Sequence, residues 1–562
     1  MPPRVILAGH NIDREILEDL RSFLVSLAAS PEQPAGSREA AAVLEEIRLR
    51  ARALLSADNW TPETLAAAYA RVSRDPRGIP ELRAIARAEV DKARRSNETI
   101  IFGLGHASVA EHAVFNLDIL GLSRMAVEVL EHQRLASYTE KSQRYILLDE
   151  DWILPEELRG TPGEAPFRQA MDAQVRFYKD AHARLLSLFE QSVPEDQRKD
   201  KATRRRLEGM AKEDARYALS LATTVQLGQT INARGLERLI SRCRAHPLQE
   251  VRELAEEAAR AVAGMAPSLV KYIEPSEFQR RAAADLREAI GSLGEPSRRI
   301  EAAPLADAAP LAGAVSRAAP LASAAPLAGA SHLAGAAQAT HPEEDTEAGS
   351  VRLVASTPEA DLALLSALLF SAGTGSVEVC RRRAGALDPK AARQLAAVAL
   401  RNLGPHDPMR REFEQVDLVF EVVLSASAFA QLKRHRMASI LTQDYDPGLG
   451  ATIPASFHGA GLVPAFRELL AATSACWNDL RTTSPEAAPY VLCNAHRRRV
   501  LFKCNARELH HVARLREDAH AQWDIRAIAS RMLEQARAVM PLTLLLACGK
   551  DRFDETRGRL FS

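Results

Sequence analysis

The chain has 562 residues, and its 73 Lys and Arg residues balance 73 Asp and Glu residues. The length exceeds what a single hydrophobic core normally serves and predicts two domains with additional segments. A net charge of zero excludes a global attraction to nucleic acid or to an anionic membrane, so any partner must be recognised by a local site.

The first predicted elements are helical. Residues 37–97 are rich in Ala and Arg, and the spacing of Leu44, Ile47 and Leu54 fits an amphipathic helix. Pro62 follows Thr61, which predicts a helix start with Thr61 as its cap. These residues form an N-terminal helical extension of the first predicted domain.

A histidine-containing cluster follows the extension, from His106 to His112. Two histidines six residues apart do not share one helix face as a helical zinc pair does, and the sequence shows no third ligand nearby. We therefore predict no metal site.

Each half of the chain then contains a strand followed by a helix. Residues 114–120 alternate between two sets of side chains and lead into a helix that ends near Arg134, and residues 416–424 alternate in the same way. Long helices are predicted over residues 203–240 and 506–540. The expected fold class is α+β, with an antiparallel or mixed sheet and long helices in each half.

A biased segment separates the halves. Between residues 295 and 350 the sequence Ala-Ala-Pro-Leu-Ala recurs at positions 302, 308, 318 and 324, without aromatic residues. Such a segment cannot bury enough apolar surface to offset its ordering entropy, so we predict a flexible linker over 291–350 between a first half, 1–290, and a second half, 351–562. The linker either keeps the two halves close, which raises their effective concentration for each other, or is a neutral insertion.

The two halves share sequence. Arg134-Leu135-Ala136-Ser137 matches residues 436–439, and Asn232-Ala233-Arg234 matches residues 505–507, in the same order. The repeat therefore spans a whole domain and predicts two tandem copies.

The repeats resemble the signature of flavin-dependent thymidylate synthases, in which Arg-His-Arg and a Ser precede Glu-x-Ser-x-Arg-Tyr. The first half retains the second part of that signature: Glu140, Ser142, Arg144 and Tyr145. The second half retains the first part: Gln431, Arg434, His435 and Arg436. The positions that depart from the family are Val129, His132, Gln133 and Thr139 in the first half and Thr442, Asp444 and Asp446 in the second.

The same division recurs further along each half. The resemblance assigns Arg216 to the position of the family's phosphate-binding Arg; the second half has Pro489 there. It assigns Arg516 to the position of the Arg that faces the uracil ring; the first half has Cys243 there. Because sites of this family lie between subunits, the resemblance implies a chimeric site for dUMP. Its residues are Glu140, Ser142, Arg144 and Arg216 from the first half and Gln431, Arg434 and Arg516 from the second.

The resemblance also implies an FAD site. Its expected residues are Ser108, Glu140, Arg434, His435, Arg436, Asn505, Arg507 and His511. A run such as 433–436 is by itself usually a solvated helix end, but the matches around it favour a role in binding the flavin. The opposite combination of halves should not bind a nucleotide monophosphate, because Asp444 and Asp446 would face its dianion.

The implied reaction is reductive methylation of dUMP, with methylenetetrahydrofolate and NADPH as co-substrates and Arg516 as the catalytic residue that polarises the uracil. Alternatives that stay open are a uridylate hydroxymethylase and a non-catalytic flavin- or nucleotide-binding regulatory protein. The family's tetramers imply a homodimer of two-domain chains, a pseudo-tetramer, with no nucleic acid or membrane partner.

The six cysteines show no metal-ligand spacing, and five lie in the second half. We expect buried thiols in a reducing compartment rather than a disulfide framework. The N-terminus has no long apolar segment, and residues 540–548 are too few to span a membrane, so the expected location is the cytoplasm.

Overall fold

The computed structural model describes residues 3–29, 38–54, 60–144, 146–147, 151–292 and 349–561. Contacts group Met1–Ser276 with Asp345–Ser562 in one compact unit and Glu277–Glu344 in a second. The second unit contains helix α12 (Glu277–Ser292). Residues 293–348, most of the predicted linker, lie outside the described residues, as does Tyr145.

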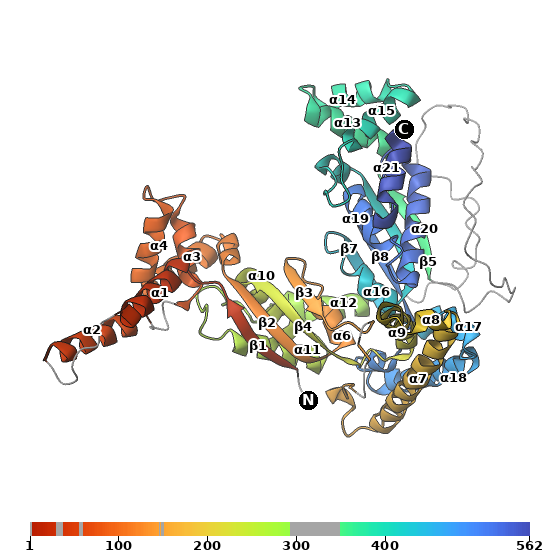
Figure 1. Cartoon of the computed structure of the whole chain (residues 1–562), viewed down its shortest axis with the longest axis horizontal. Helices are drawn as coiled ribbons and strands as arrows, with labels where there is room; N and C mark the ends of the chain where they lie inside the picture. The colour runs from red at the N-terminus through yellow and green to blue at the C-terminus, as the bar shows by residue number, and fades with distance from the viewer. Residues whose placement is uncertain are drawn as a thin grey trace. The chain divides into compact units, whose positions relative to one another are not determined.

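The first half is built on a four-stranded antiparallel sheet with the order β1-β2-β4-β3 (Figure 1). The strands are β1 (Arg4–His10), β2 (Val114–Ser123), β3 (Ala136–Glu140) and β4 (Thr224–Asn232). The helices are α1 (Arg14–Ala29), α2 (Arg38–Leu54), α3 (Glu63–Arg71), α4 (Ile79–Ala88), α5 (Val90–Glu98), α6 (Arg124–Leu130), α7 (Glu164–Gln191), α8 (Glu195–Arg198), α9 (Lys201–Ala215), α10 (Ala233–Arg244) and α11 (Gln249–Ala261).

The second half repeats this sheet with the order β5-β6-β8-β7, which confirms the predicted tandem copies (Figure 1). Its strands are β5 (Ser350–Ser356), β6 (Asp417–Ser425), β7 (Ser439–Tyr445) and β8 (Arg497–Asn505). Its helices are α13 (Ala360–Ala372), α14 (Val377–Gly385), α15 (Pro389–Leu400), α16 (Ala426–Leu432), α17 (Ser456–Gly459), α18 (Val463–Thr483), α19 (Ala506–Arg516), α20 (Trp523–Val539) and α21 (Phe553–Phe561).

Both predicted long helices are wrong in extent. The span 203–240 contains strand β4, in which Val225, Leu227 and Ile231 are buried and alternate with less buried residues, the period of a strand. The span 506–540 is divided into α19 and α20, and the side chain of Gln522 accepts hydrogen bonds from the first amides of α20.

The same capping residues join strand to helix in each half. Ser123 and Ser425 accept hydrogen bonds from amides in the first turns of α6 and α16, at 3.0 Å in both halves. Asn232 and Asn505 cap α10 and α19 in the same way. These caps fix where each helix begins and therefore where the signature residues that follow it lie.

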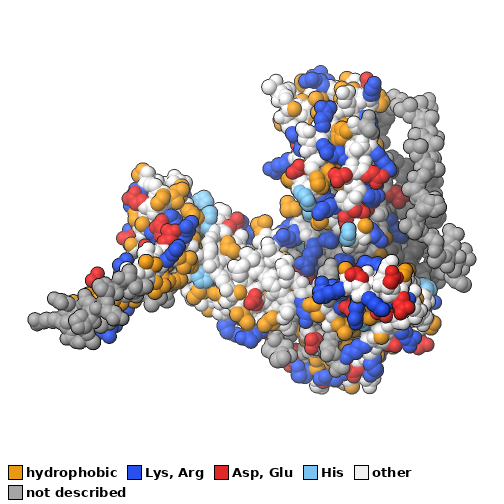
Figure 2. All heavy atoms as spheres, in the orientation of Figure 1, with side chains coloured by type: hydrophobic (Ala, Val, Ile, Leu, Met, Phe, Trp, Pro, Cys, Tyr) orange, Lys and Arg blue, Asp and Glu red, His pale blue; other side chains and the backbone are white. Residues whose placement is uncertain are grey.

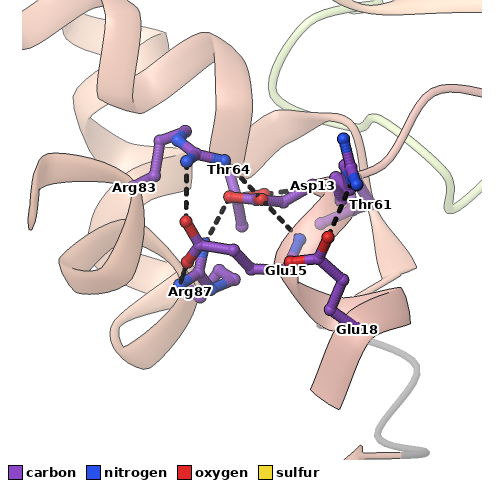
Figure 3. A network of polar contacts seen from close by, with 8 residues as sticks. Asp13, Glu15, Glu18, Thr61, Thr64, Arg83 and Arg87 are labelled. Carbon is purple, nitrogen blue, oxygen red and sulfur yellow. Dashed lines mark hydrogen bonds and ion pairs between the residues drawn. The ribbon is translucent and has the colours of Figure 1, made fainter. Parts of the chain in front are cut away.

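The N-terminal extension is held together by ion pairs (Figure 3). Asp13 is buried and lies 2.6 Å from a guanidinium nitrogen of Arg83, while Arg87 pairs with both Asp13 and Glu15. Thr61 is not the N-cap of α3 as predicted, because Pro62 takes that position, yet its hydroxyl accepts a hydrogen bond from the Glu63 amide at 3.2 Å. These contacts tie α1 to α4 and brace the start of α3.

The two halves share apolar packing. Helices α7 and α9 of the first half gather with α17 and α18 of the second (Figure 1), where buried side chains including Tyr178, Leu185, Phe457 and Phe466 form one cluster. Tyr490 and Leu492 also pack into the main core of the first half. The interface between the halves is therefore continuous with their cores.

Cationic and anionic side chains are interspersed over the face drawn in Figure 2, in keeping with their equal numbers. The six cysteines are buried and unpaired. In the described ranges no helix is long and apolar enough to cross a membrane, and no group of three or more His, Cys, Asp and Glu side chains is arranged to hold a metal ion.

Candidate active site

The halves meet across a local two-fold relation. Ser220 forms an antiparallel bridge with Cys493, its own counterpart in the repeat. Around that bridge the backbone hydrogen bonds come in equivalent pairs: Leu221 N to Leu492 O and Asn494 N to Leu219 O, each 2.8 Å. The pairing therefore resembles a symmetric dimer interface within one chain.

A second set of contacts obeys the same relation. Tyr490 donates to Glu250 at 2.6 Å, and Glu250 also accepts from the Ser123 hydroxyl at 2.7 Å. In the other direction Tyr217 donates to Asp524 at 3.0 Å, and Asp524 accepts from Ser425. Burial raises the pKa of both carboxyl groups above their usual values.

The signature residues of the two halves meet on one side of this interface. Glu140 lies 2.7 Å from Arg434 of the second half and 2.7 Å from Arg124 of its own half. Burial alone would raise the pKa of Glu140, but Arg124, Lys433 and Arg434 outweigh it, so the pKa lies below its usual value. Glu140 is therefore an anion held by cations from both halves.

Arg216 is a buried guanidinium with unsatisfied donors. Its Nε and Nη2 atoms have no hydrogen-bond partner. Burial lowers the pKa of Arg216, and the charges of Arg144 and Arg124 act in the same direction. A buried cation with free donors beside other cations is suited to an anion, and bidentate Arg contacts suit a phosphate.

Arg516 is positioned by a short relay. Its Nε donates to Nε2 of His435 at 3.1 Å, and Nδ1 of His435 lies 2.9 Å from Glu508. The relay requires Nδ1–H on a neutral imidazole, in agreement with the lowered pKa of His435, which is caused first by burial. Burial, Arg434 and Arg144 lower the pKa of Arg516 to about 10, so three arginines converge from both halves.

Two smaller polar side chains expected to bind dUMP are those of Ser142 and Gln431. Ser142 is partly buried, and its hydroxyl accepts a hydrogen bond from the Arg144 amide at 3.2 Å. Arg144 also pairs with Glu213 and donates to the His520 carbonyl of the second half at 3.5 Å. The buried Nε2 of Gln431 has no hydrogen-bond partner, so its amide is available to a ligand.

A groove of about 570 Å³ lies next to this cluster and is formed by both halves. Residues expected to bind flavin contribute Arg434, Arg436 and His511, and the first half contributes Ser137 and Asn232. The ring of His511 lies 5.5 Å from that of His435. Volume and cationic lining both fit a large anionic cofactor.

Five expected flavin residues do not line this groove: His435 and Glu140, whose contacts are given above, and Asn505, Arg507 and Ser108. Asn505 caps α19, and Arg507 donates to the Met409 carbonyl and pairs with Glu414 in its own half. Ser108 is exposed in the segment before β2. Their flavin role stays a prediction.

The opposite combination of residues forms a different cavity, of about 320 Å³. Val129, His132, Thr442 and Asp444 line it, together with Arg242 and His246, which the sequence argument did not assign. Burial first, and then Arg242 and Arg252, lower the pKa of His246 to about 4. Cys243 lies in the core with its pKa raised to about 11 by burial, and Asp446 instead accepts the Gly448 amide at 2.8 Å.

Sequence reasoning missed Glu131 and Arg124. Glu131 lies 2.9 Å from Lys433 and 2.8 Å from Arg434, and Arg124 holds Glu140. Glu131 could have been found, because it stands at the repeat position of Lys433 with the opposite charge. Arg124 follows Ser123 at the start of α6 and carries no comparable signal.

Comparison with known proteins identifies the family of the chain. A family model described as thymidylate synthase complementing protein matches residues 54–268 and 352–542. The flavin-dependent thymidylate synthase of Clostridium tetani is 32% identical over 219 residues, 38% of this chain and 83% of that protein. A UPF0159 protein from Chlamydia pneumoniae is 24% identical over 485 residues, 84% of this chain and 83% of its own length.

A solved structure is also similar: the UMP/dUMP methylase PolB from Streptomyces cacaoi bound with 5-Br dUMP has 21% identity and a TM-score of 0.30, and the match covers 36% of this chain and 97% of that one. The family model matches one segment in each half and more than half of the chain in total. The chain therefore belongs to the thymidylate synthase complementing proteins, the family of flavin-dependent thymidylate synthases.

Proposed function

We propose that the chain catalyses reductive methylation of dUMP to dTMP at a single chimeric site, to which both halves contribute. The observation that carries the proposal is the convergence of Arg144 and Arg216 from the first half with Arg434 and Arg516 from the second. Burial first, and then neighbouring arginines, lower the pKa of Arg216 and Arg516, and two nitrogens of Arg216 lack a partner, so the cluster is suited to an anion.

In this proposal Arg144 and Arg216 bind the phosphate, because Arg216 is buried with free donors and Arg144 lies beside it. Ser142 and Gln431 complete the dUMP contacts with a hydroxyl and an amide. Arg516, fixed by His435, holds its guanidinium at the uracil carbonyl and stabilises the negative charge that develops when the ring reacts.

The groove beside this cluster is the proposed FAD site. Arg434 and Arg436 offer cationic donors to a diphosphate, and Glu140 holds Arg434 in place. FAD, when bound and reduced by NADPH, would supply the hydride, and methylenetetrahydrofolate would supply the carbon. Residues of this chain bind and orient the nucleotide and exclude water from it.

The opposite cavity supports a single site per chain. Asp444 lines it where the active combination has Ser142, and His132 replaces Arg434. A carboxylate repels a phosphate dianion at short range, so dUMP should not bind there. We further propose a homodimer of two-domain chains, located in the cytoplasm.

The test is a visible absorption spectrum of the purified protein, titrated with dUMP, with flavin counted per chain. The proposal expects a single flavin per chain whose spectrum changes with dUMP and which is lost in Arg434→Ala. The matched variant His132→Ala, at the repeat position of Arg434, should keep its flavin. Two flavins per chain would refute the single site, and no flavin after added FAD would refute the enzymatic proposal.

A further inference from the structure

Among the described residues, the ion pairs between the halves run in one direction. In the described part of the chain, the carboxylates come from the first half and the cations from the second in every ion pair that joins the halves. The pairs are Glu131 with Lys433 at 2.9 Å, Glu131 with Arg434 at 2.8 Å, Glu140 with Arg434 at 2.7 Å and Glu128 with Arg498 at 2.7 Å.

One of these pairs joins equivalent positions of the repeat. Glu131 directly precedes His132, and Lys433 directly precedes Arg434, at the same place in the two signatures. Residues related in this way that touch each other lie on the local two-fold axis, as Ser220 and Cys493 also do. At such a position, two identical halves would present the same residue to each other.

Pairing of like halves would therefore bring like charges together. Two first halves would place Glu131 against Glu131, and two second halves would place both Lys433 and Arg434 against another Lys433. The side chains of Glu131 and Lys433 are 2% and 6% exposed, so solvent would screen this repulsion weakly.

The pair of Glu128 with Arg498 is lost rather than reversed in a like pairing. The repeat positions of Glu128 and Arg498 are Ala430 and Val225. Two second halves would thus bury Arg498, which is 7% exposed, without its carboxylate. Two first halves would leave Glu128 without a cation.

The contacts that are duplicated cannot make this distinction. The backbone exchange around Ser220 and Cys493, and the pairs Tyr490–Glu250 and Tyr217–Asp524, have the same chemistry on both sides of the axis. A like pairing would keep them. Discrimination by charge between like and unlike halves therefore rests on the one-way ion pairs.

From this asymmetry we infer that Glu128, Glu131 and Glu140 of the first half and Lys433, Arg434 and Arg498 of the second form a recognition surface that accepts only the other type of half. Through this surface a first half pairs with a second half. Neither half pairs with its own copy. This specificity does not depend on any ligand or on the proposed reaction.

Disulfide capture tests the pairing directly. Ser220 and Cys493 form a non-hydrogen-bonded antiparallel pair, whose short Cα separation suits a disulfide, so Ser220→Cys can trap the partner across the axis. A protease site placed between Ser292 and Gly349 allows the full chain to be cut, unfolded in urea, refolded and oxidised. Non-reducing gels then separate the three products by mass.

The inference expects first-half–second-half disulfides almost alone. A random mixture that also contains first-half and second-half homodimers would overturn it. The cut chain without Ser220→Cys is the control: it lacks a first-half thiol at the axis, so any first-half–second-half disulfide that it forms comes from the other cysteines.

Charge reversal in the uncut chain gives a second measurement that needs no refolding. Glu131→Lys and Lys433→Glu should each lower the thermal midpoint by about 5–10 °C, and the double variant should recover most of that loss. Glu131→Gln should cost less than Glu131→Lys. Additive losses in the double variant would show that charge sign does not govern the pairing and would overturn the inference.

Discussion

Arginine burial is the feature that separates the candidate site from an ordinary interface. Among the described residues, the buried guanidinium groups of Arg124 and Arg498 have carboxylate partners. Arg216 differs, since two of its nitrogens lack a hydrogen bond. Such a group costs stability in the absence of a ligand and repays that cost through binding.

Replacement of Arg216 should therefore affect binding and stability in opposite directions. Arg216→Ala should weaken dUMP binding by about 10–100-fold, because a charge-assisted contact is lost, while the thermal midpoint without ligand stays level or rises. Titration calorimetry and thermal unfolding measure the two effects. Arg242→Ala, in the opposite cavity, is the matched control and should leave dUMP binding unchanged.

Arg516 should act on the reaction rather than on the cofactor. Arg516→Ala should reduce kcat by about 100–1000-fold, as the loss of one transition-state donor does, while flavin content stays at the wild-type value. The measurements are dTMP formation and the absorption spectrum. Loss of flavin in this variant would contradict the assignment of Arg516 to the uracil.

At the scale of elements, the sequence predicted those strands and helices that a local pattern of side chains determines. The alternation over 114–120 and 416–424 predicted β2 and β6, and most signature residues lie after the helices that follow these strands, as expected. The sequence also placed Glu140 and Arg434 in one site, and these residues lie 2.7 Å apart, but it missed Arg124, which pairs with Glu140 from its own half. It misjudged β4, because Val225 to Ile231 lies within a helix-rich stretch and its alternation is short.

Contacts that depend on the partner half were the least predictable. Arg242 and His246 enter the opposite cavity because α10 and the turn after it face the second half, a geometry that one sequence does not encode locally. The relay from Glu508 through His435 to Arg516 likewise needs the packing of α19 against the end of α16.

The N-terminal extension should behave as a separate stability element. Asp13→Asn removes the charge that holds Arg83 and Arg87 (Figure 3) and should destabilise the extension by about 1–3 kcal/mol. Hydrogen exchange should report faster exchange in α1 and α4 with unchanged dUMP binding. Glu18→Gln, which removes an exposed pair with Arg14, should have little effect.

At the scale of the whole molecule, buried carboxyl groups link the pairing of the halves to pH. Burial raises the pKa of Glu250 and Asp524, so the folded chain binds more protons than the unfolded chain between the usual pKa and the raised one. Their contribution to stability is present below the unfolded pKa and is lost as pH rises through the folded pKa.

The thermal midpoint of the wild type relative to Asp524→Asn should therefore fall as pH rises through the range above the usual pKa of an aspartate. The amide keeps an oxygen that accepts from Tyr217 and Ser425 but does not ionise. The thermal midpoint of the wild type relative to Glu250→Gln, on the other side of the axis, should show the same dependence on pH. A difference that is constant over this range would mean that neither carboxyl titrates there.

The bridge between Ser220 and Cys493 has a consequence for how this protein can change over generations. In a dimer of identical subunits, one mutated codon alters both sides of the axis at once. Here the two sides are encoded at separate codons, as the different residues at 220 and 493 illustrate. One copy can therefore drift or specialise while the other keeps an inherited role, a freedom that a gene for a single-domain subunit does not have.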